Sequence, residues 1–217
     1  MKLDETTRLA LQDKMIAGIR AIGLDLPLQK TELLIRYLEL LAKWNETYNL
    51  TAVRDPQEML YRHLIDSLSI HSHVEGQRIL DVGTGPGLPG IPLAILFSEK
   101  HVILLDTNSK KTRFLTQCKI ELGLQNIEII NARVEKAKIE PRVDQIVSRA
   151  FTALGNMIDL CAAHLSSDGS FLAMKGNEPL VEYEQIPDSW KIASAVQLSV
   201  PGCTGQRHLI IIKRTER

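Results

Sequence analysis

The sequence lacks three features that would each have pointed to a particular class of protein. Its 217 residues hold only three cysteines, Cys118, Cys161 and Cys203, odd in number and far apart. Such spacing argues against a disulfide framework and a zinc site, so we expect reduced core thiols and no metal. No apolar run approaches the roughly 20 residues of a membrane-spanning helix. The opening stretch MKLDETTRLA carries acidic residues where a signal peptide would be positive. We therefore expect a cytoplasmic protein without a membrane partner.

A net charge is also missing, because 26 basic residues balance 26 acidic ones. A protein that holds bare nucleic acid unaided is usually clearly basic. Any contact with RNA must then rest on local patches, and affinity for naked RNA should be modest and sensitive to salt.

The hydrophobic pattern changes its period at residue 78. Before this point no strand is plausible, and apolar residues recur at helical spacing from Leu11 to Ile22, from Leu33 to Tyr48 and from Leu60 to Leu68. After it, short apolar runs alternate with helical stretches. We predict a helical extension over residues 1–77 and an α/β domain over residues 78–217.

Strands are predicted at residues 79–82, 102–105, 127–130, 143–148 and 171–174, with a closing hairpin at 191–200 and 208–213 and a turn at Asp168-Gly169. Helices are expected at 91–97, at 157–165, and from a cap at Asn108 or Ser109 to Gly123. The alternation implies a mostly parallel sheet covered by helices, with ligands beyond the carboxyl ends of the strands. The hairpin requires an antiparallel strand at one edge.

Four glycines crowd the stretch from Arg78 to Gly90, RILDVGTGPGLPG, where a buried strand breaks into a turn and opens a helix. Gly83, Gly85 and Gly87 suit a backbone that passes close to a ligand. A turn at a helix N-terminus also directs several free N–H groups at whatever lies above it. This stretch is the predicted cofactor site.

The glycine turn is compatible with two classes of cofactor, a dinucleotide and S-adenosylmethionine. GPGLPG matches the dinucleotide pattern G-x-G-x-x-G, and Asp106 follows at the distance expected of a ribose-binding acid. Against a dinucleotide, Asp81 ends the strand where a pyrophosphate would lie, and like charges repel. The glycine cluster also begins earlier than the match, at Gly83. S-adenosylmethionine, with its cationic sulfonium and ammonium groups, makes Asp81 favourable and leaves Asp106 for the ribose hydroxyls.

Residues after the next strands complete the expected site. Val134 and Glu135 lie where an adenine would rest, and Arg149 follows a buried strand directly and points toward the reaction centre. For Phe151 a core position is favoured over stacking on a base. For His63 and Asp66, spaced i, i+3, a solvated or capping role is favoured, as is turn chemistry for Asn45, Asn49 and Thr51.

Seven stretches together resemble one known family. They are KWNETYNLTAV, RHLIDSL, DVGTGPGLPGIPLAI, LLDTNSKKTRFL, NARVEK, VSRAF and MKG, and the likeness runs from about Lys43 to Lys213. The chain resembles the ribosomal small subunit methyltransferase G family, formerly the glucose-inhibited division protein B family. The resemblance implies a class I S-adenosylmethionine-dependent methyltransferase with a Rossmann-like, seven-stranded sheet. It also implies methylation of N7 of one guanine in the decoding-region loop of 16S ribosomal RNA.

By the same resemblance, the cofactor contacts fall on Gly83, Leu88, Val134, Glu135 and Arg149, with the segment Asp106, Thr107 and Asn108 beside the adenosine.

The expected chemistry needs no general base, because guanine N7 has an in-plane lone pair and no proton to lose. The catalytic residue is left unassigned, with Arg149 as the candidate. Bidentate contact of Arg149 with O6 and N7 would block the methylated atom, so it should contact the cofactor carboxylate, a phosphate or O6 alone. The Asn/Asp-Pro-Pro-aromatic motif of exocyclic-amine enzymes and the Pro-Cys motif of cytosine C5 enzymes are both absent from the sequence.

The RNA-binding candidates are Lys110, Lys111, Arg113, Lys175 and Arg207. Zero net charge indicates a folded small-subunit particle as the substrate. Two alternatives remain at this point: an NAD-dependent oxidoreductase, and a non-catalytic RNA-binding module of ribosome assembly.

Overall fold

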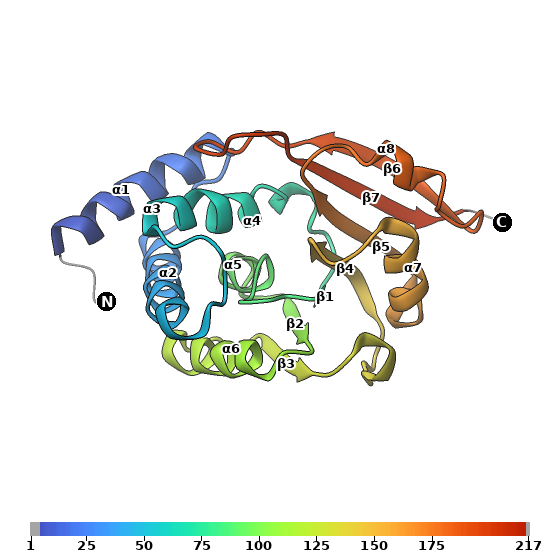
Figure 1. Cartoon of the computed structure of the whole chain (residues 1–217), viewed down its shortest axis with the longest axis horizontal. Coiled ribbons are helices and arrows are strands. Elements are labelled where there is room, and N and C mark those ends of the chain that lie inside the picture. The colour runs from blue at the N-terminus through green and yellow to red at the C-terminus, as the bar shows by residue number, and fades with distance from the viewer. Residues whose placement is uncertain (1–4, 216–217) are drawn as a thin grey trace.

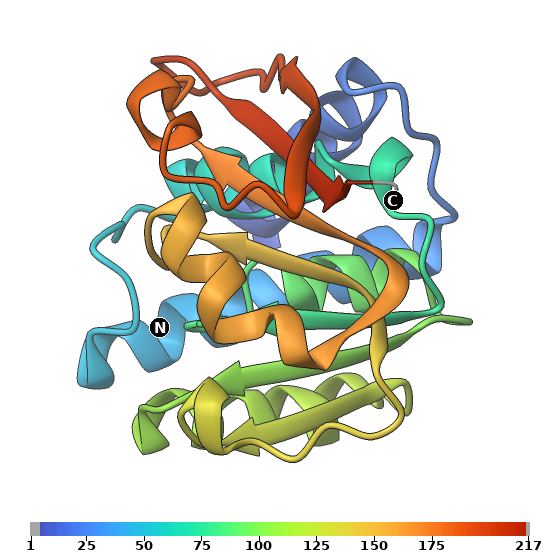
Figure 2. The same ribbon diagram turned by 90° about the vertical axis from the view of Figure 1, so that its right-hand side faces the viewer.

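The protein is built on a twisted sheet with helices against both faces (Figures 1 and 2). The computed structural model describes residues 5–215, so the ends of the two predicted parts, residues 1–4 and 216–217, lie outside the described residues. Within the described chain the sheet has seven strands in the order β3-β2-β1-β4-β5-β7-β6. Their bounds are β1 Arg78–Val82, β2 His101–Asp106, β3 Ile127–Asn131, β4 Val143–Arg149, β5 Leu165–Lys175, β6 Trp190–Gln197 and β7 His208–Arg214.

The mostly parallel sheet is confirmed, with two differences in detail. The neighbours from β3 to β5 pair in parallel, and β7 pairs antiparallel with both β5 and β6. The antiparallel strand therefore lies one place in from the edge, because β7 folds back between β5 and β6. The predicted turn at Asp168-Gly169 is wrong, since both residues lie within β5. The pairing of β4 with β5 is irregular there, since its register shifts between Val143 and Gln145, and a Cβ on Gly169 would lie 2.8 Å from the Asp144 carbonyl oxygen.

Helical segments fill the predicted stretches. The helical segments are α1 Glu5–Ala21, α2 Leu28–Tyr48, α3 Pro56–Met59, the π-helix η1 Leu60–Ile65, α4 Asp66–Leu68, α5 Gly90–Leu96, α6 Ser109–Leu122, α7 Leu154–Cys161 and α8 Leu180–Tyr183, with short 3₁₀ turns η2 His71–His73, η3 Val134–Lys136 and η4 Ala162–His164. Of these, α8 and the 3₁₀ turns η2 and η3 are helical segments that were not predicted. The third predicted helix is the continuous run of α3, η1 and α4. Asn108 caps α6 by accepting a hydrogen bond from the Lys110 N–H, and left-handed Gly123 ends it.

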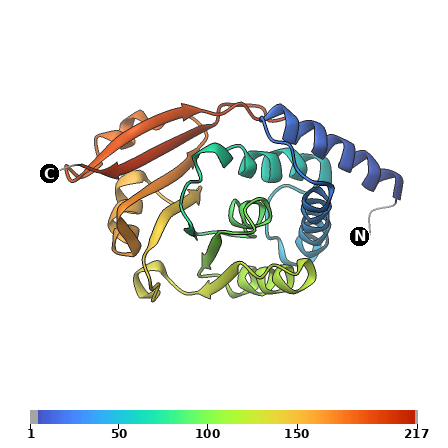
Figure 3. The same ribbon diagram turned by 180° about the vertical axis from the view of Figure 1, so that it is seen from behind.

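Two apolar clusters hold the sheet, one on each face. One combines side chains of α1, α2, η1, α5 and α6 with inward residues of β1 and β2, and the other combines α7 with the opposite face. Figure 3 shows α1 and α2 on the same side of the sheet as α5 and α6. The helices of residues 1–77 therefore share a core with the sheet, and a division at residue 78 stays a prediction.

Cys118 and Cys161 are buried, Cys203 is half-buried, and all three are free thiols. Across residues 5–215, no three His, Cys, Asp or Glu residues gather as metal ligands. In the same range, no helix has the length and apolar character needed to cross a membrane.

Candidate functional site

The glycine turn after β1 is tightly packed. Gly83 and Gly87 have φ angles of 66° and 99°, in the left-handed region that disfavours other residues. A Cβ on Gly83 would lie 2.7 Å from the Phe151 ring, and one on Gly87 would lie 2.4 Å from Ile91 Cγ1. Both positions require glycine, so the turn has a fixed shape.

The Asp81 carboxylate faces the turn from within the protein. The residue is fully buried, and its Oδ2 accepts hydrogen bonds from Thr84 Oγ1 at 2.6 Å and from the Gly90 N–H at 2.7 Å. Its Oδ1 has no hydrogen-bond partner among the described residues. Burial raises the pKa of Asp81 to about 7, against the lowering effect of these two hydrogen bonds. Asp81 holds the turn together, and its contact with a cationic cofactor stays a prediction.

Asp106 ties the end of β2 to the same turn. Its Oδ2 accepts from the Gly85 N–H at 2.9 Å, and its Oδ1 accepts from the Asn108 N–H at 2.8 Å. Lys111 Nζ lies 3.7 Å from Oδ2. These contacts fix the carboxylate at the carboxyl end of the sheet, where two vicinal hydroxyl groups could reach its remaining lone pairs.

A cavity of about 380 Å³, the glycine-turn pocket, opens at the carboxyl ends of β1 to β4. It is lined by Gly83, Leu105, Asp106, Thr107, Lys111, Arg133, Val134, Glu135, Ala150, Phe151 and Leu160. The pocket gathers five of the predicted cofactor residues: Gly83, Asp106, Thr107, Val134 and Glu135. Of the others, Asp81, Gly85, Gly87, Leu88 and Asn108 do not line it, and Arg149 lines a second cavity.

Several lining residues were not predicted for this pocket. Lys111 was assigned to RNA, and Phe151 was favoured as a core residue. The ring of Phe151 is half-buried against Gly83 and forms part of the pocket wall. The position of Phe151 directly after a buried strand is the sequence signal that could have placed it at the pocket. No such signal exists for Leu160 on α7, because the sequence of a helix does not indicate which cavity its face borders.

A larger cavity of about 500 Å³, the arginine pocket, adjoins the first. Its lining is Arg62, His63, Asp66, Arg149, Ala150, Met174, Lys175, Gly176, Leu198, Arg207 and His208. Ala150 lines both cavities and has a φ of 55°, a left-handed conformation that is unusual for alanine. Strained backbone of this kind clusters at functional sites. The turn that leaves β4 therefore forms the boundary between the two pockets.

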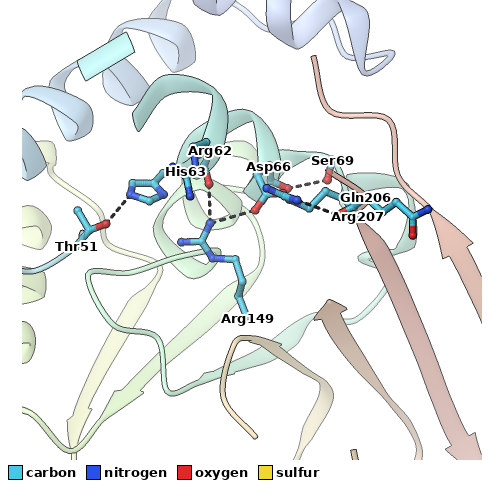
Figure 4. A network of polar contacts seen from close by, with 8 residues as sticks. All are labelled: Thr51, Arg62, His63, Asp66, Ser69, Arg149, Gln206 and Arg207. Carbon is cyan, nitrogen blue, oxygen red and sulfur yellow. Dashed lines mark hydrogen bonds and ion pairs between the residues drawn. The ribbon is translucent and has the colours of Figure 1, made fainter. Parts of the chain in front are cut away.

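Asp66 joins two arginines at the arginine pocket (Figure 4). Arg149 Nη1 lies 3.0 Å from Asp66 Oδ2, and Arg207 Nε lies 3.2 Å from Oδ1. Arg149 Nη1 also donates to the Arg62 carbonyl oxygen at 2.9 Å. Residues from the π-helix region, β4 and the segment before β7 thus meet at one carboxylate, and π-helical turns often occur at functional sites.

His63 lies beside this network. His63 is 6% exposed and Asp66 is 3% exposed, so the favoured solvated or capping interpretation of this pair is wrong. His63 Nε2 lies 2.8 Å from Thr51 Oγ1. Burial, and then the charge of Arg149, lower the pKa of His63 to about 4, so its ring is neutral at neutral pH.

Turn chemistry is confirmed on the neighbouring loop. Buried Asn45 donates to the Val53 carbonyl oxygen and accepts from the Thr51 N–H.

The five RNA-binding candidates do not form one surface. Lys110 and Arg113 are exposed on α6, whereas Lys111 lines the glycine-turn pocket. Lys175 and Arg207 line the arginine pocket. Lys175 Nζ also bonds the Glu182 carboxylate at 2.8 Å and the Thr152 carbonyl oxygen at 3.1 Å.

Comparison with known proteins decides the family. The family model described as rRNA small subunit methyltransferase G matches residues 30–210. A ribosomal RNA small subunit methyltransferase G of Marinobacter nauticus is 51% identical, over 92% of this chain and 94% of the relative. One from Pseudomonas fluorescens is 49% identical, over 94% of this chain and 95% of that protein. The chain belongs to the rRNA small subunit methyltransferase G family. It is therefore a member of a methyltransferase family, as its motifs predicted.

Solved structures agree on the fold. TrmN from Thermus thermophilus superposes with a TM-score of 0.57 at 17% identity, covering 72% of this chain and 53% of that one. A ribosomal protein L11 methylase from Lactobacillus delbrueckii subsp. bulgaricus gives 0.55 at 18% identity, covering 71% and 79%. TYW2 of M. jannaschii in complex with AdoMet gives 0.52 at 15% identity, covering 70% and 76%. The Rossmann-like methyltransferase fold is thus shared at low sequence identity.

Proposed function

We propose that this protein transfers the methyl group of S-adenosylmethionine to N7 of a single guanine, of the guanine-527 type, in the decoding-region loop of 16S ribosomal RNA. Family membership supports the methyl transfer and the ribosomal RNA. The observation that carries the proposal is the pair of adjoining cavities that share Ala150. One has the residues of a nucleoside site, and the other is large enough for a base and is lined by positive charge.

The glycine-turn pocket fits S-adenosylmethionine by its donor set. Asp106 is placed to accept from the ribose hydroxyls, because its carboxylate is already held at the end of β2 by two backbone N–H groups. Val134 and Leu160 offer apolar contact for an adenine ring. Gly83 lines the pocket at the turn, where we expect the amino-acid part of the cofactor. When bound, the cofactor supplies a methyl group on a cationic sulfur.

The protein's residues then act by placement. Transfer to N7 requires a lone pair aligned with the methyl–sulfur bond, and such alignment alone accounts for large rate effects. Asp66, the carboxylate of the arginine pocket, is already paired with two guanidinium groups and accepts a hydrogen bond from each. A reaction that needs no general base suits this arrangement.

The proposed partner is 16S ribosomal RNA within a small-subunit particle, and the proposed location is therefore the cytoplasm. A chain with balanced charge and scattered basic residues gains little from backbone contacts alone. The particle would supply the orientation that the free RNA lacks.

The test is to incubate the protein with labelled S-adenosylmethionine and small subunits that lack the modification, and then to map the methylated nucleotide. We expect one 7-methylguanine in the decoding-region loop, formed faster on particles than on the deproteinised RNA at physiological salt. Methyl groups on another nucleotide, or on a different atom of guanine, would overturn the proposal.

A further inference from the structure

We propose that Asp66 reads the Watson–Crick edge of the target guanine, accepting hydrogen bonds from N1–H and the N2 amine, while Arg149 donates to O6. This inference rests on the proposed function and assigns the specificity of the same site. It concerns a carboxylate for which sequence patterns favour a solvated or capping role.

The charge pattern of the arginine pocket singles out Asp66. Among the described residues that line the pocket, Asp66 is the one carboxylate, set among the basic side chains of Arg62, Arg149, Lys175 and Arg207. The Asp66 side chain is only 5% exposed. A nearly buried carboxylate on the wall of a cavity is expensive unless it is paired. Its two arginine contacts neutralise it in the free protein.

The order of groups along the pocket wall matches the order of atoms around guanine. Ala150 stands at the boundary with the glycine-turn pocket, Arg149 precedes it in the chain, and Asp66 contacts Arg149 at 3.0 Å. In guanine the sequence of atoms is N7, O6, N1 and N2. With N7 turned toward the boundary, the acceptor O6 meets a guanidinium donor, and the N1–H and N2 donors meet a carboxylate.

This placement also explains why Arg149 does not block the reaction. A guanidinium that takes both O6 and N7 would occupy the atom to be methylated. Here Arg149 Nη1 is held beside Asp66 by the Arg62 carbonyl oxygen, a contact that does not depend on Asp66 and that stays available when the base enters. O6 alone is then within its reach.

When the base enters, hydrogen bonds between Asp66 and the two arginines are replaced by hydrogen bonds to guanine. Each carboxylate oxygen of Asp66 accepts from one arginine in the free protein. When N1–H and the N2 amine approach, Arg149 turns to O6 and Arg207 is released toward a backbone phosphate. Every charged group keeps a partner.

The same wall rejects adenine. Adenine presents a donor amine where guanine has O6, and a lone pair at N1 where guanine has a hydrogen. Arg149 would then face a donor, and Asp66 would face an acceptor. A site built to hydrogen-bond its substrate discriminates strongly against an analogue that leaves these groups unpaired.

The test pairs Asp66→Asn with an inosine at the target position, since inosine lacks only the N2 amine. The measured quantity is the ratio of kcat/KM on guanine-containing and inosine-containing reconstituted small subunits. Wild-type protein should prefer guanine by about tenfold or more, the discrimination of one good polar contact. Asp66→Asn should be slower on guanine and should show a ratio close to one. Its affinity for S-adenosylmethionine by calorimetry should match the wild type.

Glu128→Gln is the matched control, because Glu128 is an exposed carboxylate on β3 that lines neither pocket. Its guanine preference should equal that of the wild type. If Asp66→Asn does not fold, Asp66→Glu keeps the charge and displaces the carboxylate, and the ratio should fall in the same way.

An equal guanine preference in the wild type and the folded Asp66 variant would overturn the inference while leaving the proposed function intact. Absence of methyl transfer by the wild type to guanine itself would overturn both.

Discussion

The hydroxyl group of Tyr37 donates a hydrogen bond of 2.8 Å to the carbonyl oxygen of Pro86, in the middle of the glycine turn. Tyr37 belongs to α2 and is fully buried. Burial raises the pKa of its hydroxyl well above the ordinary value, so the group remains a donor at physiological pH. The helical extension therefore supports the turn directly, in addition to sharing its core.

Tyr37→Phe should lower stability and weaken cofactor binding together. The ring keeps its packing, but the buried Pro86 carbonyl loses its donor, which costs about 1–3 kcal/mol. Chemical denaturation measures the first effect and calorimetry with S-adenosylmethionine the second. Tyr48→Phe, at the exposed end of the same helix, is the control and should change neither. Unchanged stability of Tyr37→Phe would show that the turn holds its shape without α2.

The Asp81 carboxyl should make stability fall as pH rises. Its pKa is raised from 3.8 to about 7 in the folded state, so folding favours the protonated form. The stabilisation is complete below the unfolded value and is lost as pH rises through about 7, at roughly 1.4 kcal/mol per unit of pKa shift. Asp81→Asn keeps an acceptor for Thr84 and Gly90 but cannot ionise. Free energies of unfolding at pH 5 and pH 8 should differ more in the wild type than in Asp81→Asn; parallel profiles would contradict the assignment.

Gly90→Ala should destabilise the protein through a clash at the start of α5. A Cβ there would lie 2.2 Å from Leu104 Cδ2 and 2.7 Å from Asp81 Oδ2. Overpacking of this kind costs about 1–3 kcal/mol. At Gly176 the nearest atom would be 3.9 Å away, so Gly176→Ala should leave the unfolding midpoint almost unchanged. Equal midpoints for the two variants would be the contrary result.

Substitution of Lys110 should affect RNA binding, whereas substitution of Lys111 should affect cofactor binding. Lys111 Nζ lies 3.7 Å from Asp106 Oδ2 and restrains that carboxylate. Lys111→Gln should weaken S-adenosylmethionine binding by about two- to fivefold, as loss of a partly exposed ion pair allows. Exposed Lys110→Gln should leave cofactor affinity unchanged and only reduce binding to small subunits, more so at low salt. Calorimetry that shows the same cofactor affinity for both variants would disagree with this separation.

Local sequence signals located the glycine turn and five of the residues that line the first pocket. Strands and helices follow from residue periodicity, and the cap at Asn108 and the stop at Gly123 follow from neighbours within a few residues. In a parallel sheet the residue after each strand falls at the same edge. This rule is why the sequence pattern alone predicts that Gly83, Asp106 and Val134 lie around one cavity.

The sequence by itself determined the fold class, the family and the position of the glycine turn, because those depend on short-range pattern and contiguous motifs. Tertiary structure decided where the carboxylates point. Asp81 lies one residue before the end of β1, yet its carboxylate oxygen accepts hydrogen bonds from the turn from inside the protein. Asp66 meets Arg149 and Arg207 across separations of 83 and 141 residues. No local period reports such a meeting, since it depends on β7 folding back between β5 and β6 and carrying Arg207 to the end of the π-helix.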